Sequence, residues 1–160
     1  MKPFDIRGVK SHDLPVFVDN LRAADIREIV AATGSVDIKK SLGLTIRHSD
    51  HVFVAYGEKS PLLMFGSAKR SDTSMVIWAV GTPFITDYSR EFISMSRELL
   101  KTWFQLNPEV QYMWNFTYAE NTLHHRWLKW CGAELLPPIS SGPRGERFIP
   151  FVIKRTDYDV

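Results

Sequence analysis

The sequence has a single cysteine, Cys131, among its 160 residues. A lone cysteine excludes an internal disulfide and any cysteine-rich zinc site. No apolar run approaches the roughly 18 residues that a membrane span needs. The N-terminus, MKPFDIRGVK, also lacks the hydrophobic region of a secretory signal. We therefore expect no membrane association and a reducing, cytosolic compartment.

The sequence also has little net charge. A formal charge of +2 is too small to indicate a nucleic-acid partner. The fractions of hydrophobic residues (44%) and charged residues (24%) are typical of a soluble globular protein. A length of 160 residues predicts a single domain over residues 1–160.

Apolar periodicity predicts alternating strands and helices. Strands are expected at residues 4–9, 51–56, 62–68, 75–80, 112–119 and 147–154, and helices at residues 13–20, 22–32, 86–106 and 121–132, with another beginning near residue 35. Residues 137–145, rich in proline and glycine, read as a loop. This order predicts an α/β (α+β) fold, with a mixed sheet flanked by helices.

The stretch YMWNFTYAENTLHHRWLKWCGA, residues 112–133, is the most informative part of the chain. It reads as a strand followed by an amphipathic helix, with Asn121 as N-cap and Gly132 as the left-handed stop. The spacing predicts that one apolar side of this helix is buried and that His125 and Lys129 are exposed. The residues expected to be buried are Leu123, Trp127, Leu128 and Cys131.

This unit resembles the last β-α segment of the GNAT acetyltransferase fold. The resemblance implies a mixed, mostly antiparallel central sheet flanked by helices, with a β-α-β-α-β C-terminal half. It also implies that strands 75–80 and 112–119 are parallel neighbours that separate at their C-terminal ends. A tyrosine that often serves the family as general acid is replaced here by Leu128, and Ala133 stands where the family usually has phenylalanine.

Three segments are similar to a narrower group, the internal virion protein A family of short-tailed bacteriophages. They are LR-x-x-D-x-x-E at residues 21–28, IWAVGT at residues 77–82, and WN followed by ENTLHHRWLKWCGA within residues 114–133. This resemblance implies a role in virion assembly or infection through contacts with a phage or host protein. The expected location is the host cytoplasm, or the virion itself.

In GNAT enzymes a glycine-rich loop before the long helix holds the pyrophosphate of coenzyme A, where bare amides and a helix dipole favour an anion. Here the corresponding residues 80–92 contain one glycine, and Asp87 would oppose the phosphates. The alternative interpretation is an ordinary capped helix start at Thr86 or Asp87. If acetyl-CoA binds, the candidate cofactor-binding residues are Val80, Gly81, Arg90 and Asn121.

Two further clusters each allow a functional and a structural interpretation. Adjacent helical histidines such as His124 and His125 point in different directions, so we expect a solvated helix face and no metal site. Asp25 and Glu28 share one helical face, where a carboxylate base could deprotonate an amine. Their neighbours Arg22 and Arg27 favour a surface ion-pair cluster instead.

Aromatic residues are concentrated in the C-terminal half, notably Trp127 and Trp130. Most are expected in the core, and one or two, beside Arg126 and Lys129, fit a protein-binding surface. Cys131 is expected to be a small buried hydrophobe.

These observations predict a phage GNAT-fold protein that acts through protein contacts without robust acetyl transfer and requires no cofactor. The alternative is an acetyl-CoA-dependent N-acetyltransferase that modifies a host or phage protein. A third possibility is a small module that occupies a host factor. No residue is assigned a catalytic role from the sequence, and the oligomeric state is not predicted.

Overall fold

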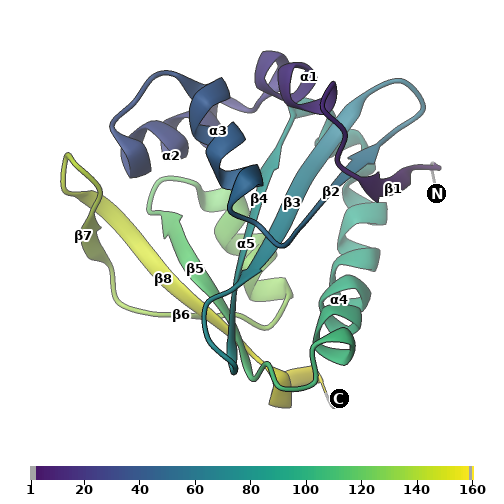
Figure 1. Ribbon diagram of the computed structural model, residues 1–160, viewed down its shortest axis with the longest axis vertical. Helices are drawn as coiled ribbons and strands as arrows, with labels where there is room; N and C mark the ends of the chain where they lie inside the picture. The colour runs from purple at the N-terminus through teal and green to yellow at the C-terminus, as the bar shows by residue number, and fades with distance from the viewer. Residues whose placement is uncertain (1–2, 159) are drawn as a thin grey trace.

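The computed structural model describes residues 3–158 and 160, and its centre is a twisted sheet (Figure 1). The strand order is β1-β2-β3-β4-β5-β8-β6, with β7 beside β8. The strands are β1 (Asp5–Gly8), β2 (His51–Tyr56), β3 (Pro61–Lys69), β4 (Ser74–Gly81), β5 (Tyr112–Tyr118), β6 (Glu134–Leu135), β7 (Ile139–Ser141) and β8 (Glu146–Lys154).

Helices cover both faces of the sheet. They are α1 (Asp13–Asn20), α2 (Ala23–Thr33), α3 (Ile38–Arg47), α4 (Ser89–Leu106) and α5 (Thr122–Trp130), with short 3₁₀ helices η1 (Pro83–Tyr88) and η2 (Arg155–Tyr158). One core joins the sheet to α1, α2 and α3 around Phe17, Leu42 and Met64. The other joins it to α4 and α5 around Phe104 and Leu128. The alternation of side chains along the strands supplies both cores.

The sheet has the predicted mostly antiparallel character. Every strand pair among the described residues is antiparallel except β4 and β5, which are parallel. The helix α4 connects these two strands and is long enough for such a crossover. The prediction that they are parallel neighbours is therefore confirmed.

Local sequence signals explain several helix ends. The Asp37 side chain accepts a hydrogen bond from the Lys40 N–H at 3.1 Å and so caps α3. Gly34, with φ of 72°, ends α2, and Gly132, with φ of 86°, follows α5. Both glycines take the left-handed conformation that other residues adopt at a cost, so the predicted stop at Gly132 is confirmed.

Three local predictions are wrong. The helix α4 does not begin at Thr86 or Asp87, because η1 comes first and the Thr86 hydroxyl donates to the Pro83 carbonyl at 2.9 Å. The loop predicted at residues 137–145 contains β7, which pairs with β8. Leu123 is 40% exposed, since it lies on the first turn of α5, away from the core around Leu128.

Among the described helices, none has both the length and the apolar character needed to cross a membrane.

Candidate active site

The strands β4 and β5 are paired only at their start and then separate. Ser74–Val76 pairs with 112–114, and beyond this point the two strands diverge, with α5 visible between them in Figure 1. This separation was predicted from the family resemblance and is confirmed. It opens a gap in the middle of the sheet.

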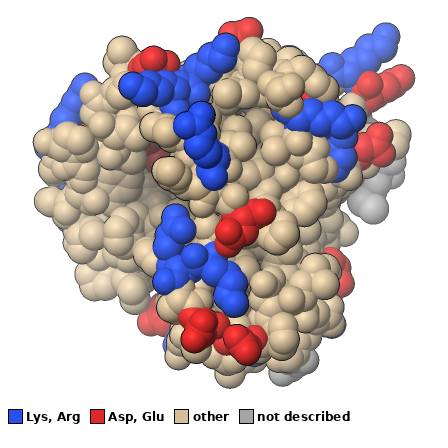
Figure 2. Space-filling model, viewed as in Figure 1, with Lys and Arg blue, Asp and Glu red and all other residues tan. Residues whose placement is uncertain are grey.

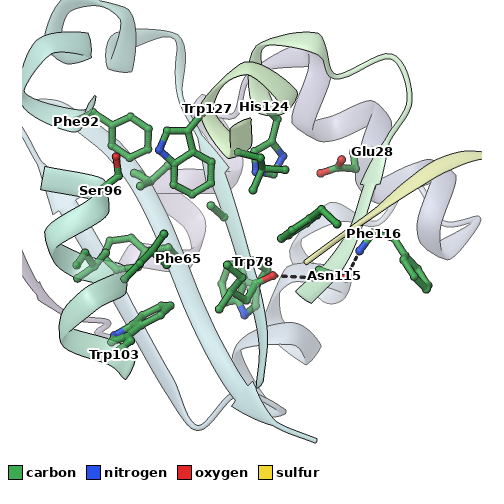
Figure 3. Close-up of a pocket in the computed structure, with 17 residues that line it drawn as sticks. Glu28, Phe65, Trp78, Phe92, Ser96, Trp103, Asn115, Phe116, His124 and Trp127 are labelled. Carbon is green, nitrogen blue, oxygen red and sulfur yellow. Dashed lines mark hydrogen bonds between the residues drawn. The ribbon is translucent and has the colours of Figure 1, made fainter. Parts of the chain in front are cut away.

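Asn115 holds the strands apart where the pairing stops. Its side-chain Nδ2 donates to the Ile77 carbonyl at 2.9 Å, and its Oδ1 accepts from the Phe116 N–H at 2.7 Å (Figure 3). The side-chain amide thus replaces the direct peptide–peptide bond expected in a parallel ladder. The sequence analysis did not identify Asn115, although a polar residue between aromatic ones in a strand was a signal.

The open edge of β4 carries backbone groups that face the gap. The Thr82 N–H donates to the Leu62 carbonyl of β3 at 3.1 Å. Because successive peptide groups in a strand point to opposite sides, those of Ile77, Ala79 and Gly81 face β5. Ala79 therefore presents its peptide group to the gap, between the Asn115 bridge and Gly81.

The N-terminal end of α2 closes the far end of this edge. The Gly81 N–H donates to Asp25 Oδ2 at 2.9 Å, and the Gly81 carbonyl accepts from the Arg22 N–H at 2.9 Å. Asp25 also accepts from Arg22 Nη1 at 3.2 Å and from Asn121 Nδ2 at 3.1 Å. Its side chain is 2% exposed, and burial raises its pKa.

Glu28 extends from α2 to the open edge of β5. Its Oε1 accepts hydrogen bonds from the Tyr118 N–H and from the Thr117 hydroxyl, the latter at 3.2 Å. Burial raises the pKa of Glu28 to about 7, and the nearby charge of Asp25 acts in the same direction. At neutral pH this carboxylate can therefore both accept and release a proton.

The prediction that Asp25 and Glu28 form a surface ion-pair cluster is wrong. Their helical face is directed at the gap between β4 and β5, and the ion pair of Asp25 with Arg22 is part of the buried network. The shared face was visible in the sequence. Its direction depends on where α2 packs.

The two adjacent histidines contact β5, so the prediction of a solvated helix face is also wrong. His124 Nδ1 lies 3.4 Å from the Thr117 hydroxyl, and burial lowers the pKa of His124 to about 4. His124 is therefore neutral at neutral pH. His125 Nε2 lies 2.9 Å from the Tyr118 carbonyl oxygen. Figure 3 shows Glu28 and His124 on facing sides of the gap.

A groove of about 470 Å³ opens from the gap toward α4 and α5. Phe92 of α4 stacks on Trp127 of α5 across its inner end, with ring centroids 5.3 Å apart. The Trp127 Nε1–H is buried and has no hydrogen-bond partner among the described residues. The rest of the wall is mostly apolar, with two cations, Arg22 and Arg126, and one carboxylate, Asp25. Its other residues are Leu63, Ala79, Gly81, Ile85, Thr86, Ser89, Ile93, Leu123, His124 and Trp130.

A second recess, which we call the hollow, lies on the α3 side of the sheet and has a volume of about 690 Å³. Ala79 lines both the groove and the hollow. A smaller cavity of about 60 Å³ lies between them and shares Glu28, Asn115 and Phe116 with the hollow. The small cavity also shares Ala79 and Trp127 with the groove, so it lies between the two recesses, and Glu28 lines this cavity and the hollow.

The residues proposed from the sequence as a cofactor site are only partly brought together. Gly81 lines the groove. Asn121 is buried and holds Asp25; its side chain does not cap α5, contrary to the predicted role. Val80 packs in the core on the α3 side. Arg90 and Asp87 are exposed and outside the residues that line the groove.

Neither a metal nor a cysteine nucleophile is indicated by the described residues. No group of three or more histidine, cysteine, aspartate or glutamate side chains among them is placed to hold a metal ion. Cys131 and Leu128 are buried as predicted, with exposures of 1% and 0%. Burial raises the pKa of Cys131 to about 12, so its sulfur is a protonated thiol at neutral pH.

Comparison with known proteins identifies the fold. No family model matches the chain, and no curated protein matches it. Several solved structures are similar to the chain. The crystal structure of aminoglycoside acetyltransferase AAC(6')-Ib in complex with coenzyme A is 15% identical in sequence to this chain and superimposes with a TM-score of 0.70, with 98% of each chain covered. A spermidine N-acetyltransferase from Vibrio cholerae, in complex with coenzyme A and spermine, has 12% identity and a TM-score of 0.68, with 98% of each chain covered. A GNAT-family acetyltransferase from Bacillus anthracis has 15% identity and a TM-score of 0.69, covering 96% of this chain and 95% of its own. The chain therefore has the GNAT acetyltransferase fold.

Proposed function

We propose that the protein transfers an acyl group from a coenzyme A thioester to an amine, with Glu28 as the general base. The position of Glu28 carries this proposal: it lines the hollow and the small cavity that lies between the hollow and the groove, and its pKa is about 7. A base with a pKa near the working pH is the most effective one for removing a proton from a reacting group. Solved structures of the same fold bind coenzyme A, which supports the choice of donor.

The groove has the character that a coenzyme A arm requires. Its walls are mostly apolar, as expected of a pocket that takes a largely apolar ligand segment. Arg126 provides positive charge along the same groove, where Arg22 is paired with Asp25. When bound, a coenzyme A thioester would supply the activated acyl group, and its thiol would be the leaving group.

The protein's own groups then have separate tasks. The amine enters from the hollow and loses its proton to the Glu28 carboxylate, which the Tyr118 N–H and the Thr117 hydroxyl hold in place. The Ala79 N–H faces the gap and offers a hydrogen bond to negative charge that develops there. Neutral His124 closes the α5 side without placing a positive charge beside Glu28. Leu128 cannot donate a proton, so we expect a modest rate.

A second candidate follows from the resemblance to internal virion protein A: a GNAT-fold protein of phage origin that acts through contacts with a phage or host protein and transfers no acyl group at a useful rate. Two observations favour it. Leu128 occupies the place of the family's general acid, and the residues of η1 include no glycine that would let phosphate approach the backbone. Trp130, 44% exposed beside Arg126, would then belong to the contact surface.

Calorimetric titration with acetyl-CoA, followed by a thiol-release assay against mixed amine acceptors, separates the two candidates. We expect binding and turnover above background, both unchanged in Arg144→Gln, an exposed control outside the groove and the hollow. Absence of binding and of turnover would reject the transferase and leave the contact role. Turnover that persists unchanged in Glu28→Gln would reject Glu28 as the base.

A further inference from the structure

The hollow through which the amine would enter has an unequal distribution of charge. Among the described residues that line it are the basic side chains of Lys40, His48 and Arg70, and Glu28 is the one carboxylate. Figure 2 shows this face of the molecule, where Lys and Arg side chains lie over and below α3, with an acidic side chain beside them and others at the lower end. An anion that approaches the opening of the hollow therefore meets Lys40 and Arg70, while Glu28 lies deeper, toward the gap between β4 and β5.

The basic groups come from separate elements that converge on the hollow. Lys40 is in the first turn of α3, His48 directly follows that helix, and Arg70 begins the turn between β3 and β4. Lys40 and Arg70 are exposed, and neither forms an ion pair within the part of the chain that the structure describes. Their charges are thus available to a ligand.

The walls below these charges are aromatic. Trp78 lines the hollow, and its Nε1–H donates to the Ser49 hydroxyl at 2.9 Å, which fixes the ring. Phe116, 41% exposed, lines the hollow next to the Asn115 bridge. Such walls pack against the carbon skeleton of an acceptor, while the charged rim contacts its polar ends.

We infer, building on the proposed transfer reaction, that the acceptor is an amine flanked by carboxylates, as in an acidic peptide segment. The amine would approach Glu28, and the carboxylates would face Lys40 and Arg70. A polycation would place its additional positive charges at the same rim and be repelled. Complementary charge of this kind raises the rate of encounter and selects among partners more than it raises affinity.

The test uses three peptides of equal length, rich in glutamate, glutamine or arginine, each with one free amine, together with free glutamate. Binding of each is measured by calorimetry, and acylation by acetyl-CoA is measured by mass spectrometry. We expect the glutamate-rich peptide to bind most tightly and to be acylated fastest. Its advantage should decrease as salt increases, because exposed charges are screened. If free glutamate equals the glutamate-rich peptide, the source of the carboxylates is a small molecule and the charge preference still holds.

Two charge reversals locate the effect. Lys40→Glu and Arg70→Glu should each lower kcat/KM and affinity for the glutamate-rich peptide by about two- to fivefold, the range of an exposed ion pair. Lys39→Glu and Lys69→Glu make the same charge change at exposed neighbours outside the hollow and should have little effect.

The outcomes separate this inference from the proposed function. If the arginine-rich peptide binds as tightly as the glutamate-rich one, or if Lys39→Glu and Lys40→Glu have equal effects, the inference is wrong, even when transfer occurs. Tight, salt-sensitive binding of the acidic peptide without any acylation would support the charge preference and reject the transferase.

Discussion

Asp13 and Glu28 are both carboxylates held inside the fold, yet their pKa values are displaced in opposite directions. Asp13, at the start of α1, is 0% exposed. Burial works to raise its pKa, but the surrounding hydrogen bonds hold that pKa well below its usual range. The pKa of Glu28 is instead raised to about 7. Burial alone therefore does not decide the charge state of a carboxylate in this protein.

The difference lies in the donors that each carboxylate receives. Asp13 accepts two hydrogen bonds from the Arg7 guanidinium, both at 2.8 Å, one from the Lys10 N–H at 2.7 Å and one from the Tyr56 hydroxyl at 2.7 Å. The guanidinium charge and these donors favour the ionised form.

Glu28 accepts hydrogen bonds from the Tyr118 N–H and the Thr117 hydroxyl, and the Asn121 side chain also acts to lower its pKa. Burial outweighs these donors, and a second carboxylate, Asp25, lies nearby and raises the pKa further. Glu28 also lines the cavity and the hollow. The carboxylate with a complete set of donors holds β1, α1 and β2 together. The carboxylate whose burial outweighs its donors can exchange a proton near neutral pH, which is the property that the proposed reaction uses.

The largest effect is expected from Glu28→Gln. This change keeps the size of the side chain and removes the base, so the rate of acyl transfer should fall by about 10²–10⁴-fold. Binding of acetyl-CoA, measured by calorimetry, should be nearly unchanged. A comparable loss of binding would mean that Glu28 shapes the groove and is not the base.

The next effect concerns stability. Asp13→Ala leaves the Arg7 guanidinium, the Lys10 N–H and the Tyr56 hydroxyl without their acceptor, and should lower the free energy of unfolding by about 2–4 kcal/mol. Denaturant titration measures this loss. Tyr56→Phe removes one of the donors and should cost about 1 kcal/mol. Equal stability of Asp13→Ala and the unchanged protein would show that the network around Asp13 contributes little.

The dependence of stability on pH should show both carboxylates with opposite signs. Because the folded pKa of Glu28 is raised, its contribution is most favourable below about pH 4.3 and declines, by about 3–4 kcal/mol, as the pH rises to about 7. Because the folded pKa of Asp13 is lowered, its contribution is present above about pH 3.9 and is lost as the pH falls below that value. Unfolding should be measured from about pH 3 to 8 in the unchanged protein and in Glu28→Gln. Only the variant should lose the decline in stability between about pH 4.3 and 7. The same decline in the variant would contradict the raised pKa of Glu28.

The smallest effect should come from Asp25→Asn. The charge of Asp25 raises the pKa of Glu28, so its removal should shift the midpoint of the pH–rate profile downward from about 7, by up to about one unit. The rate itself should rise with pH through this midpoint, since only ionised Glu28 can accept a proton. Asp19→Asn, on the exposed side of α1, is the matched control. A midpoint that does not move would mean that burial alone sets the pKa of Glu28.

The sequence predicted much of the fold and little of the site. Periodicity placed β4, β5, α4 and α5 within a few residues, and the pattern from Asn121 to Gly132 identified the unit that ends in α5. It did not show that Asn115 would bridge Ile77 and Phe116, because that bridge depends on how the two strands meet. It also led to Asp25 and Glu28 as a surface cluster, since nearby arginines are typical of an exposed helix face.

What the sequence determined by itself is local: most of the apolar positions in the helices, the glycine stop after α5, and the spacing that puts Asp25 and Glu28 on one face of α2. These depend on neighbours a few residues away, and the chain carries that information directly. Only the tertiary structure decided that this face lies over the gap between β4 and β5, where the Tyr118 N–H, 90 residues further along the chain, reaches Glu28. The pKa of a carboxylate follows from its solvation and from the donors around it, and both are set by packing of distant segments.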